Sequence, residues 1–223
     1  MYGGARQQHQ LQVSQQTEMF ILGDIGEFKA VGDMLPIAAA SLIGVDVGVL
    51  LSRFAGVGGY SLNTYFDTFG LEGVLANVFL LMLIFQAARW GYTTFYASGQ
   101  RPWSPFVFVC CAIGVQVLHD LFIYYGPLKT IPAGKNEMVD ALKRYAAENG
   151  SRAITGNSAM IVLVSIIAMF LRESSDVFIF LLSAISIYAL PFLLNTLGPK
   201  PPPPPPPPPK KDPFEQRITG PRI

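Results

Sequence analysis

Apolar runs long enough to cross a lipid bilayer are the feature that most constrains this chain. A helix of about 20 apolar residues spans the hydrocarbon core of a membrane. The third, fourth and fifth runs reach that length, the first two are borderline, and the first contains Asp46. The sequence therefore predicts an all-α fold, a polytopic transmembrane helical bundle with four or five spans. The candidate spans are residues 35–52, 73–90, 105–125, 153–171 and 177–197.

The composition agrees with a membrane location. Of the 223 residues, 51% are hydrophobic and only 14% are charged, whereas about a quarter of the residues in soluble domains are charged. The formal net charge of +1 does not indicate a nucleic-acid-binding protein. We expect the lipid bilayer to be a partner, and we expect no small-molecule substrate.

Polar segments divide the chain into three parts. Residues 1–33 form a polar, Gln-rich N-terminal segment, residues 34–198 form the transmembrane helical region, and residues 199–223 form a polyproline and basic tail. The tail contains nine consecutive prolines from Pro201 to Pro209. Such a run is expected to form a polyproline II rod of roughly 28 Å, at about 3.1 Å per residue. The alternative is a disordered low-complexity tail.

A polar loop between the third and fourth spans contains a predicted amphipathic helix at residues 136–148, which ends at Asn149-Gly150. Its apolar face carries Met138, Leu142 and Tyr145, and its polar face carries Lys143, Arg144 and Glu148. Two hypotheses fit this pattern. The helix rests on the bilayer surface, or it docks onto a protein partner.

The loop between the fourth and fifth spans is very short, from Arg172 to Asp176. A connection of this length is typical of a tight antiparallel helix hairpin. The sequence therefore predicts that spans 153–171 and 177–197 are direct neighbours.

With five spans, the sixteen Lys and Arg residues divide unevenly between the two sides of the membrane. Five lie on the N-terminal side, namely Arg6, Lys29, Arg89, Arg101 and Arg172. The other eleven lie on the side of the predicted loop helix and the tail. Cytosolic loops carry the excess of positive charge, so we expect the C-terminal side to face the cytosol. Asn149, a glycosylation acceptor by pattern, should then stay unmodified.

Polar residues inside the spans are costly and need an explanation. The third span contains Gln116, His119 and Asp120, with Gln116 three and four residues before the other two. Together with Asp46 of the first span they would suit a proton or ion path. Alternatively, they form hydrogen bonds between helices. The two hypotheses differ in whether these side chains line one continuous polar cavity or face separate neighbours.

No catalytic or cofactor-binding motif is present in the sequence. It has no Walker loop, nucleophile elbow, Cys-x-x-Cys pair or zinc signature. Its two histidines, His9 and His119, are far apart, and Cys110-Cys111 is expected to pack within a helix. Residues 57–60 have a weak likeness to a potassium selectivity filter and are expected to be a flexible Gly-rich loop. We therefore expect that the protein is not an enzyme and that it has no cofactor or metal site.

Residues 85–195 resemble polytopic virion membrane proteins of large icosahedral DNA viruses of the chlorella-virus and mimivirus kind. The stretches that carry the resemblance are 116–125, 131–140 and 153–160, in a pattern of helix, docking segment and helical hairpin. The resemblance implies a minor capsid protein of the internal virion membrane, made in a host secretory membrane, that contacts major and minor capsid proteins. The side predicted to be cytosolic would face the shell.

Two hypotheses about function follow. In the first, the helices anchor in a viral inner membrane, and the loop and tail bind the protein shell. The expected contacts are Lys135, Met138, Leu142, Lys143, Arg144, Tyr145, Pro201, Pro209, Lys210, Lys211 and Phe214. In the second, the chain is a small ion channel or proton-linked transporter that uses Asp46, Gln116, His119 and Asp120.

Overall fold

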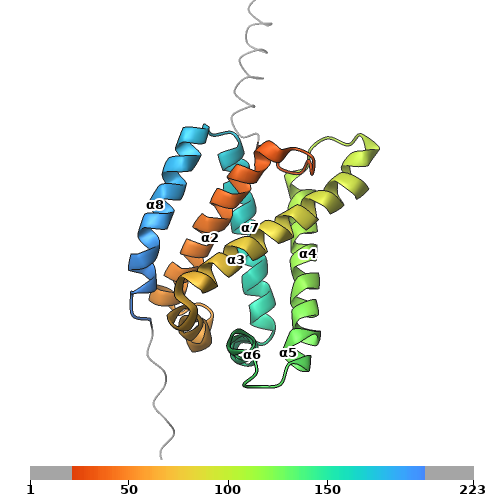
Figure 1. Cartoon of the computed structure of the whole chain (residues 1–223). Coiled ribbons are helices and arrows are strands. Elements are labelled where there is room, and N and C mark those ends of the chain that lie inside the picture. Colours follow the sequence, from red (N-terminus) through yellow and green to blue (C-terminus); the bar gives the residue numbers. More distant parts are fainter. Residues whose placement is uncertain (1–21, 199–223) are drawn as a thin grey trace, which may run out of the picture.

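The computed structural model describes residues 22–198, and all regular elements in this part of the chain are helices (Figure 1). The long ones are α2 (Met34–Ala55), α3 (Gly59–Phe95), α4 (Pro105–Tyr125), α7 (Ser151–Arg172) and α8 (Asp176–Leu194). The short ones are η2 (Val31–Asp33), η3 (Ala97–Gly99), α5 (Pro127–Thr130) and α6 (Glu137–Asn149). The five long helices are each long and apolar enough to cross a membrane. The prediction of an all-α membrane protein is confirmed.

Helix α2 occupies the centre of the bundle, although its predicted span, residues 35–52, was borderline in length. It packs against α7 on one side and α8 on the other, and it also contacts α3 (Figure 1). Small residues allow this close packing. A Cβ atom added at Gly44 would lie only 2.4 Å from Cγ2 of Val164 in α7. The glycines and alanines of α2 therefore make it thin enough to fit between two neighbours.

The prediction that the fourth and fifth spans pack directly against each other is wrong. Helices α7 and α8 are joined by a short turn, but α2 lies between them and contacts both (Figure 1). A short connection keeps the two helix ends together, yet it does not prevent the helices from diverging. The thin central helix α2 occupies the space that opens between them.

The second predicted span, residues 73–90, is part of a longer helix with a break. Gly70 has φ 48° and ψ −124°, a non-helical conformation within α3. Only glycine adopts such a left-handed backbone without strain. Residues 71–95 then cross the bundle obliquely (Figure 1). The predicted flexible loop at residues 57–60 is shorter than expected, because Gly59 and Tyr60 already belong to α3.

The alternation of the five long helices gives the bundle two distinct ends. At the N-terminal end lie residues 22–33, the end of α3, and the turn between α7 and α8 (Figure 1). At the C-terminal end lie the α2–α3 turn, α5, α6 and the end of α8 (Figure 1). The loops and helix ends therefore divide between the two ends of the bundle in the way that the count of basic residues on each side assumed. The assignment of the C-terminal end to the cytosol stays a prediction.

Candidate functional site

The four polar residues proposed for an ion path form two separate groups. In the first, the Ser186 hydroxyl of α8 donates to Asp46 Oδ2 of α2. In the second, Gln116 Nε2 donates to Asp120 Oδ1 at 2.6 Å, and His119 Nδ1 lies 3.4 Å from the same oxygen. No hydrogen bond or ion pair joins the two groups within residues 22–198.

Each group connects two helices. Asp46 and Ser186 link α2 to α8, and Asn157 Nδ2 of α7 donates to Asp120 Oδ2 of α4 at 3.0 Å. These side chains therefore face separate neighbours, as expected for hydrogen bonds between membrane helices. Ser186 and Asn157 were not among the residues predicted from the sequence. In the sequence, each of them is only a polar residue within an apolar run. Such a residue does not reveal which side chain it binds.

Helix α6 is fixed to the chain's own α3. Glu148 accepts hydrogen bonds from the backbone N–H groups of Tyr60 and Ser61, at 2.9 and 2.7 Å. Asn149 Nδ2 donates to Gly58 O at 3.0 Å. A carboxylate at this position caps the first turn of α3 and interacts favourably with its dipole. Contacts to Ser61 and Tyr60 lower the pKa of the Glu148 carboxyl below its ordinary value.

The close approach of Glu148 also explains a glycine at the start of α3. Gly59 has φ 72°, and a Cβ atom added there would lie 2.3 Å from Glu148 Oε1. A side chain at this position would displace the carboxylate from the helix terminus. The α6–α3 contact therefore depends on both residues.

The apolar face of α6 is largely taken up by the chain itself. Val139 and Ala141 are buried, and Met138, Leu142 and Tyr145 are half-buried. Lys143 is also half-buried, and its Nζ donates to Ile131 O at 2.5 Å. Of the described residues predicted to bind a partner, Lys135 and Arg144 remain exposed. The predicted tail contacts Pro201, Pro209, Lys210, Lys211 and Phe214 lie outside the described residues, as does the polyproline rod.

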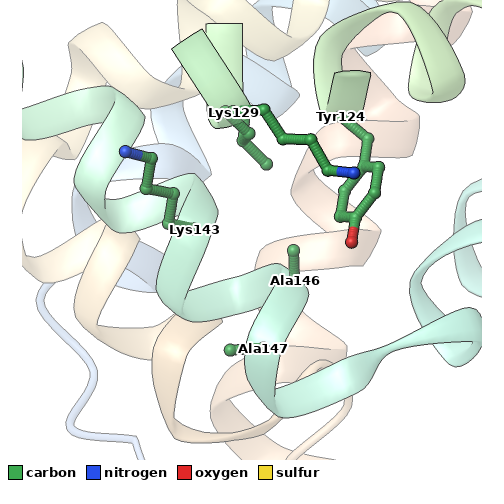
Figure 2. Close-up of a pocket in the computed structure, with 6 residues that line it drawn as sticks. Tyr124, Lys129, Lys143, Ala146 and Ala147 are labelled. Carbon is green, nitrogen blue, oxygen red and sulfur yellow. The ribbon is translucent and has the colours of Figure 1, made fainter. Parts of the chain in front are cut away.

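An open cavity of about 270 Å³ lies where the end of α4 meets α5 and α6 (Figure 2). Its lining residues are Tyr124, Leu128, Lys129, Lys143, Ala146 and Ala147. In Figure 2 the Lys129 side chain extends toward the Tyr124 ring, while α6 contributes the two alanines. The Lys129 ammonium lies 5.1 Å from the centroid of the Tyr124 ring and 4.6 Å from that of Tyr125. This is the arrangement of a cation–π contact.

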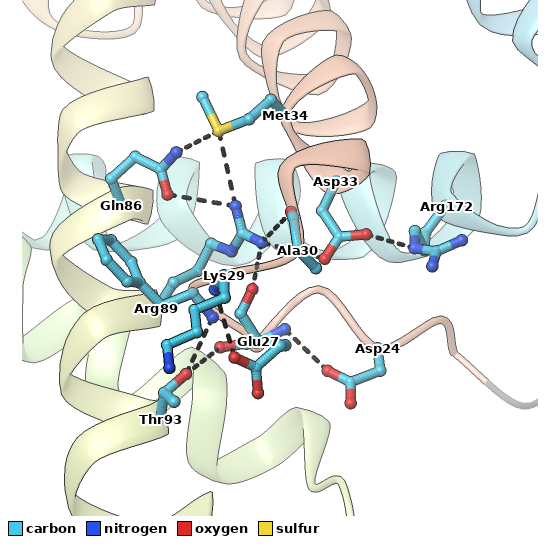
Figure 3. Close-up of polar contacts among 12 residues, drawn as sticks. Asp24, Glu27, Lys29, Ala30, Asp33, Met34, Gln86, Arg89, Thr93 and Arg172 are labelled. Carbon is cyan, nitrogen blue, oxygen red and sulfur yellow. Dashed lines mark hydrogen bonds and ion pairs between the residues drawn. The ribbon is translucent and has the colours of Figure 1, made fainter.

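A buried charge cluster holds the N-terminal end of the bundle together (Figure 3). Arg89 Nη2 lies 3.0 Å from Asp33 Oδ2 and donates to Ala30 O at 2.7 Å. The second oxygen of Asp33 lies 2.5 Å from Arg172 Nε of α7. Asp33 therefore bridges α3 and α7. The sequence analysis counted Arg89 among the basic residues of the N-terminal side and did not predict that it is buried.

Residues 22–33, which we call the N-terminal strap, are fixed to the bundle by further hydrogen bonds. Thr93 Oγ1 donates to Gly26 O at 2.9 Å and accepts from Phe28 N at 3.0 Å. Trp103 Nε1 donates to Leu22 O at 3.0 Å. The sequence assigned these residues to a polar N-terminal segment, yet in the structure they pack as part of the helical region.

A second buried arginine connects three helices at the opposite end. Arg53 Nη2 lies 2.6 Å from Asp67 Oδ1 and donates to Leu194 O at 3.1 Å. Arg53 Nη1 donates to Asn63 Oδ1 at 3.2 Å. The guanidinium thus links α2, α3 and the C-terminal end of α8, where a positive charge complements the helix dipole.

Residues 22–198 contain no group of three or more His, Cys, Asp or Glu side chains placed to hold a metal ion. Cys110 is exposed, Cys111 is half-buried, and both are free thiols. Comparison with known protein families, curated proteins and solved structures finds no match to this chain.

Proposed function

We propose that this chain is a minor capsid protein that links an internal viral membrane to the protein shell above it. The proposal starts from the resemblance of residues 85–195 to virion membrane proteins. The observation that carries it is that α5, α6 and the end of α8 gather at one end of the bundle (Figure 1). The helices that connect the third and fourth spans therefore lie on the same side as the last described residues, from which the tail continues.

The geometry of α6 suits a structural link. Glu148 and Asn149 bind it to the start of α3, and its apolar face packs on the chain. The exposed charge of Arg144 is consequently carried by a fixed element. Lys135 lies in the loop before α6, and Gly134 N of this loop donates to Asp140 Oδ2 of α6 at 2.8 Å. Because little conformational freedom is lost when such an element binds, preorganisation lowers the cost of association.

The polar residues in the spans support anchoring over transport. Asp46 bonds to α8 and Asp120 bonds to α7, so the two carboxylates stabilise different helix pairs. A proton-linked transporter would need polar groups that form one path across the bilayer.

The shell-facing surface would combine the exposed loop charges with the tail. An acidic rim on a capsid protein would suit Lys135, Arg144 and the tail lysines Lys210 and Lys211, and a groove lined by aromatic rings would suit the prolines. The chain would lie in a host secretory membrane during assembly and in the inner membrane of the mature virion.

Incorporation into particles tests this proposal. Deletion of residues 201–223 should leave the helical region in membranes but reduce the amount of the protein in purified particles, relative to the major shell protein. Replacement of only Pro201–Pro209 by Gly and Ser should give an intermediate defect through lost stiffness. Lys29→Glu, at the opposite end of the bundle, is the control. Wild-type incorporation of a protein that lacks the tail and also carries Lys135→Glu and Arg144→Glu would refute the proposal.

A further inference from the structure

The cavity between α4, α5 and α6 carries positive charge that the neighbouring acids do not neutralise. No carboxylate lies within ion-pair distance of Lys129 or Lys143 among residues 22–198. The nearby acids have other partners on the protein. Glu148 binds the start of α3, Asp140 Oδ2 accepts from Gly134 N at 2.8 Å, and Asp120 accepts from Gln116 and Asn157.

The cavity is placed at the expected depth of a lipid headgroup. Its lining residue Tyr124 is in the last turn of the membrane-spanning helix α4, and Lys129 follows in α5. Tyrosines and lysines are typical of this interfacial layer. The cavity is also open rather than enclosed, and Ala146 and Ala147 leave room beside the Lys129 side chain (Figure 2).

An apolar surface continues from the cavity toward the membrane core. Leu121 lies one turn before Tyr124 on α4, and Leu118 lies one turn before Leu121. Their side chains are 40% and 69% exposed. Consecutive members of this series are three residues apart and adjoin on the helix surface, so an acyl chain could extend along these leucines while its phosphate stays at Lys129. This continuity favours a phospholipid over a free phosphate ion.

We propose that this cavity binds the phosphate-containing headgroup of an anionic phospholipid from the leaflet at the C-terminal end. Lys129 supplies the positive charge at the phosphate, the alanines supply the space, and Leu121 and Leu118 contact the acyl chain. Lys143 lines the cavity, but its ammonium donates to Ile131 O and points away from Lys129 (Figure 2). Basic pockets beside membrane helices on the cytoplasmic side bind anionic headgroups in this way. The site extends beyond the proposed link to a shell and does not depend on it.

Native mass spectrometry of the full chain, purified in detergent, tests the site with phosphatidylserine as the probe. Phosphatidylcholine and inorganic phosphate are the comparison ligands. Lys129→Gln should weaken phosphatidylserine binding about fivefold, the factor that corresponds to one juxtamembrane lysine. Ala147→Trp should block binding while both lysines remain, because it fills the cavity. The matched control is Lys135→Gln, which removes an exposed lysine of the same loop outside the lining.

Saturable phosphatidylserine binding that Lys129→Gln and Ala147→Trp reduce, and Lys135→Gln leaves within twofold, supports the site. Equal losses from Lys129→Gln and Lys135→Gln would show a general surface charge effect and overturn it. Equal binding of phosphatidylcholine would also overturn it. If inorganic phosphate binds as tightly as the lipid, the cavity is a soluble-anion site and the lipid assignment is wrong.

Discussion

Asp33 Oδ2 lies 3.0 Å from Arg89 Nη2, and the two side chains are 2% and 0% exposed. Asp33 directly precedes α2, and Arg89 lies near the end of α3. The pair therefore fixes the start of the central helix to the end of the oblique one. Arg172 of α7 contacts the other oxygen of Asp33, so three helices meet at one carboxylate.

Removal of one partner of this pair should destabilise the fold strongly. We expect Asp33→Ala to cost about 3–5 kcal/mol, because it leaves the buried guanidinium without its counter-charge. Thermal unfolding in detergent measures the loss. Lys29→Gln, an exposed change in the same strap, should leave the melting temperature unchanged. Equal melting temperatures for Asp33→Ala and the wild type would show that the pair does not hold the strap.

The contact between Glu148 and α3 should depend on pH. The pKa of Glu148 is lowered, chiefly by its hydrogen bonds to Ser61. A lowered pKa means that the contact contributes its full stability above the ordinary value of 4.5 and loses it as the pH falls through the lower folded value. Hydrogen-exchange protection of the Tyr60 and Ser61 amides should therefore decline in acid. Glu148→Gln should abolish this decline, and the same decline in that variant would contradict the assignment.

Close packing of α2 on α7 should make Gly44 intolerant of a side chain. Gly44→Ala places a Cβ atom 2.4 Å from Val164 Cγ2, and overpacking of this kind costs about 1–3 kcal/mol. Gly114→Ala in α4 is the matched control, because a Cβ atom there meets nothing within 4 Å. Unfolding in detergent should separate the two variants. If both unfold like the wild type, α2 does not pack closely on α7 as described.

Asp120 should contribute to stability and not to ion transport. Asp120→Ala removes the acceptor for Gln116 and Asn157, and we expect a loss of about 1–3 kcal/mol. A pH-sensitive dye trapped in vesicles reports proton flux across their membrane. We expect the flux into vesicles that contain the wild-type protein to equal the flux into protein-free vesicles. A wild-type flux that Asp120→Asn or His119→Ala abolishes would instead support the transporter hypothesis.

Local signals in the sequence predicted the elements of the fold well. The apolar runs mark the five long helices, and α6 begins and ends within one residue of the predicted range. Asn136 Oδ1 accepts from Val139 N at 3.0 Å and caps the start of α6, while Gly150 follows its end. These boundaries depend on neighbouring residues only, so a single sequence reveals them.

Contacts between distant segments were not predictable in the same way. The small residues of α2 allow its close packing in the bundle, but no local pattern identifies α7 and α8 as its neighbours. The burial of Arg89 was not predicted, because its partner Asp33 lies 56 residues away in the chain. Likewise, nothing near Asp46 indicates Ser186. Each of these pairs depends on how the helices pack, which periodicity alone does not determine.

Chemical cross-linking of intact particles through lysine side chains tests the central claim most directly, because the chain carries its own control. Lys135 is exposed at the C-terminal end of the bundle, and Lys29 is exposed at the N-terminal end. We predict that Lys135 and the tail lysines Lys210 and Lys211 form cross-links to capsid proteins, whereas Lys29 forms none. Cross-links to the shell from Lys29 alone, or from neither end, would contradict a protein that links the membrane to the shell through its C-terminal end.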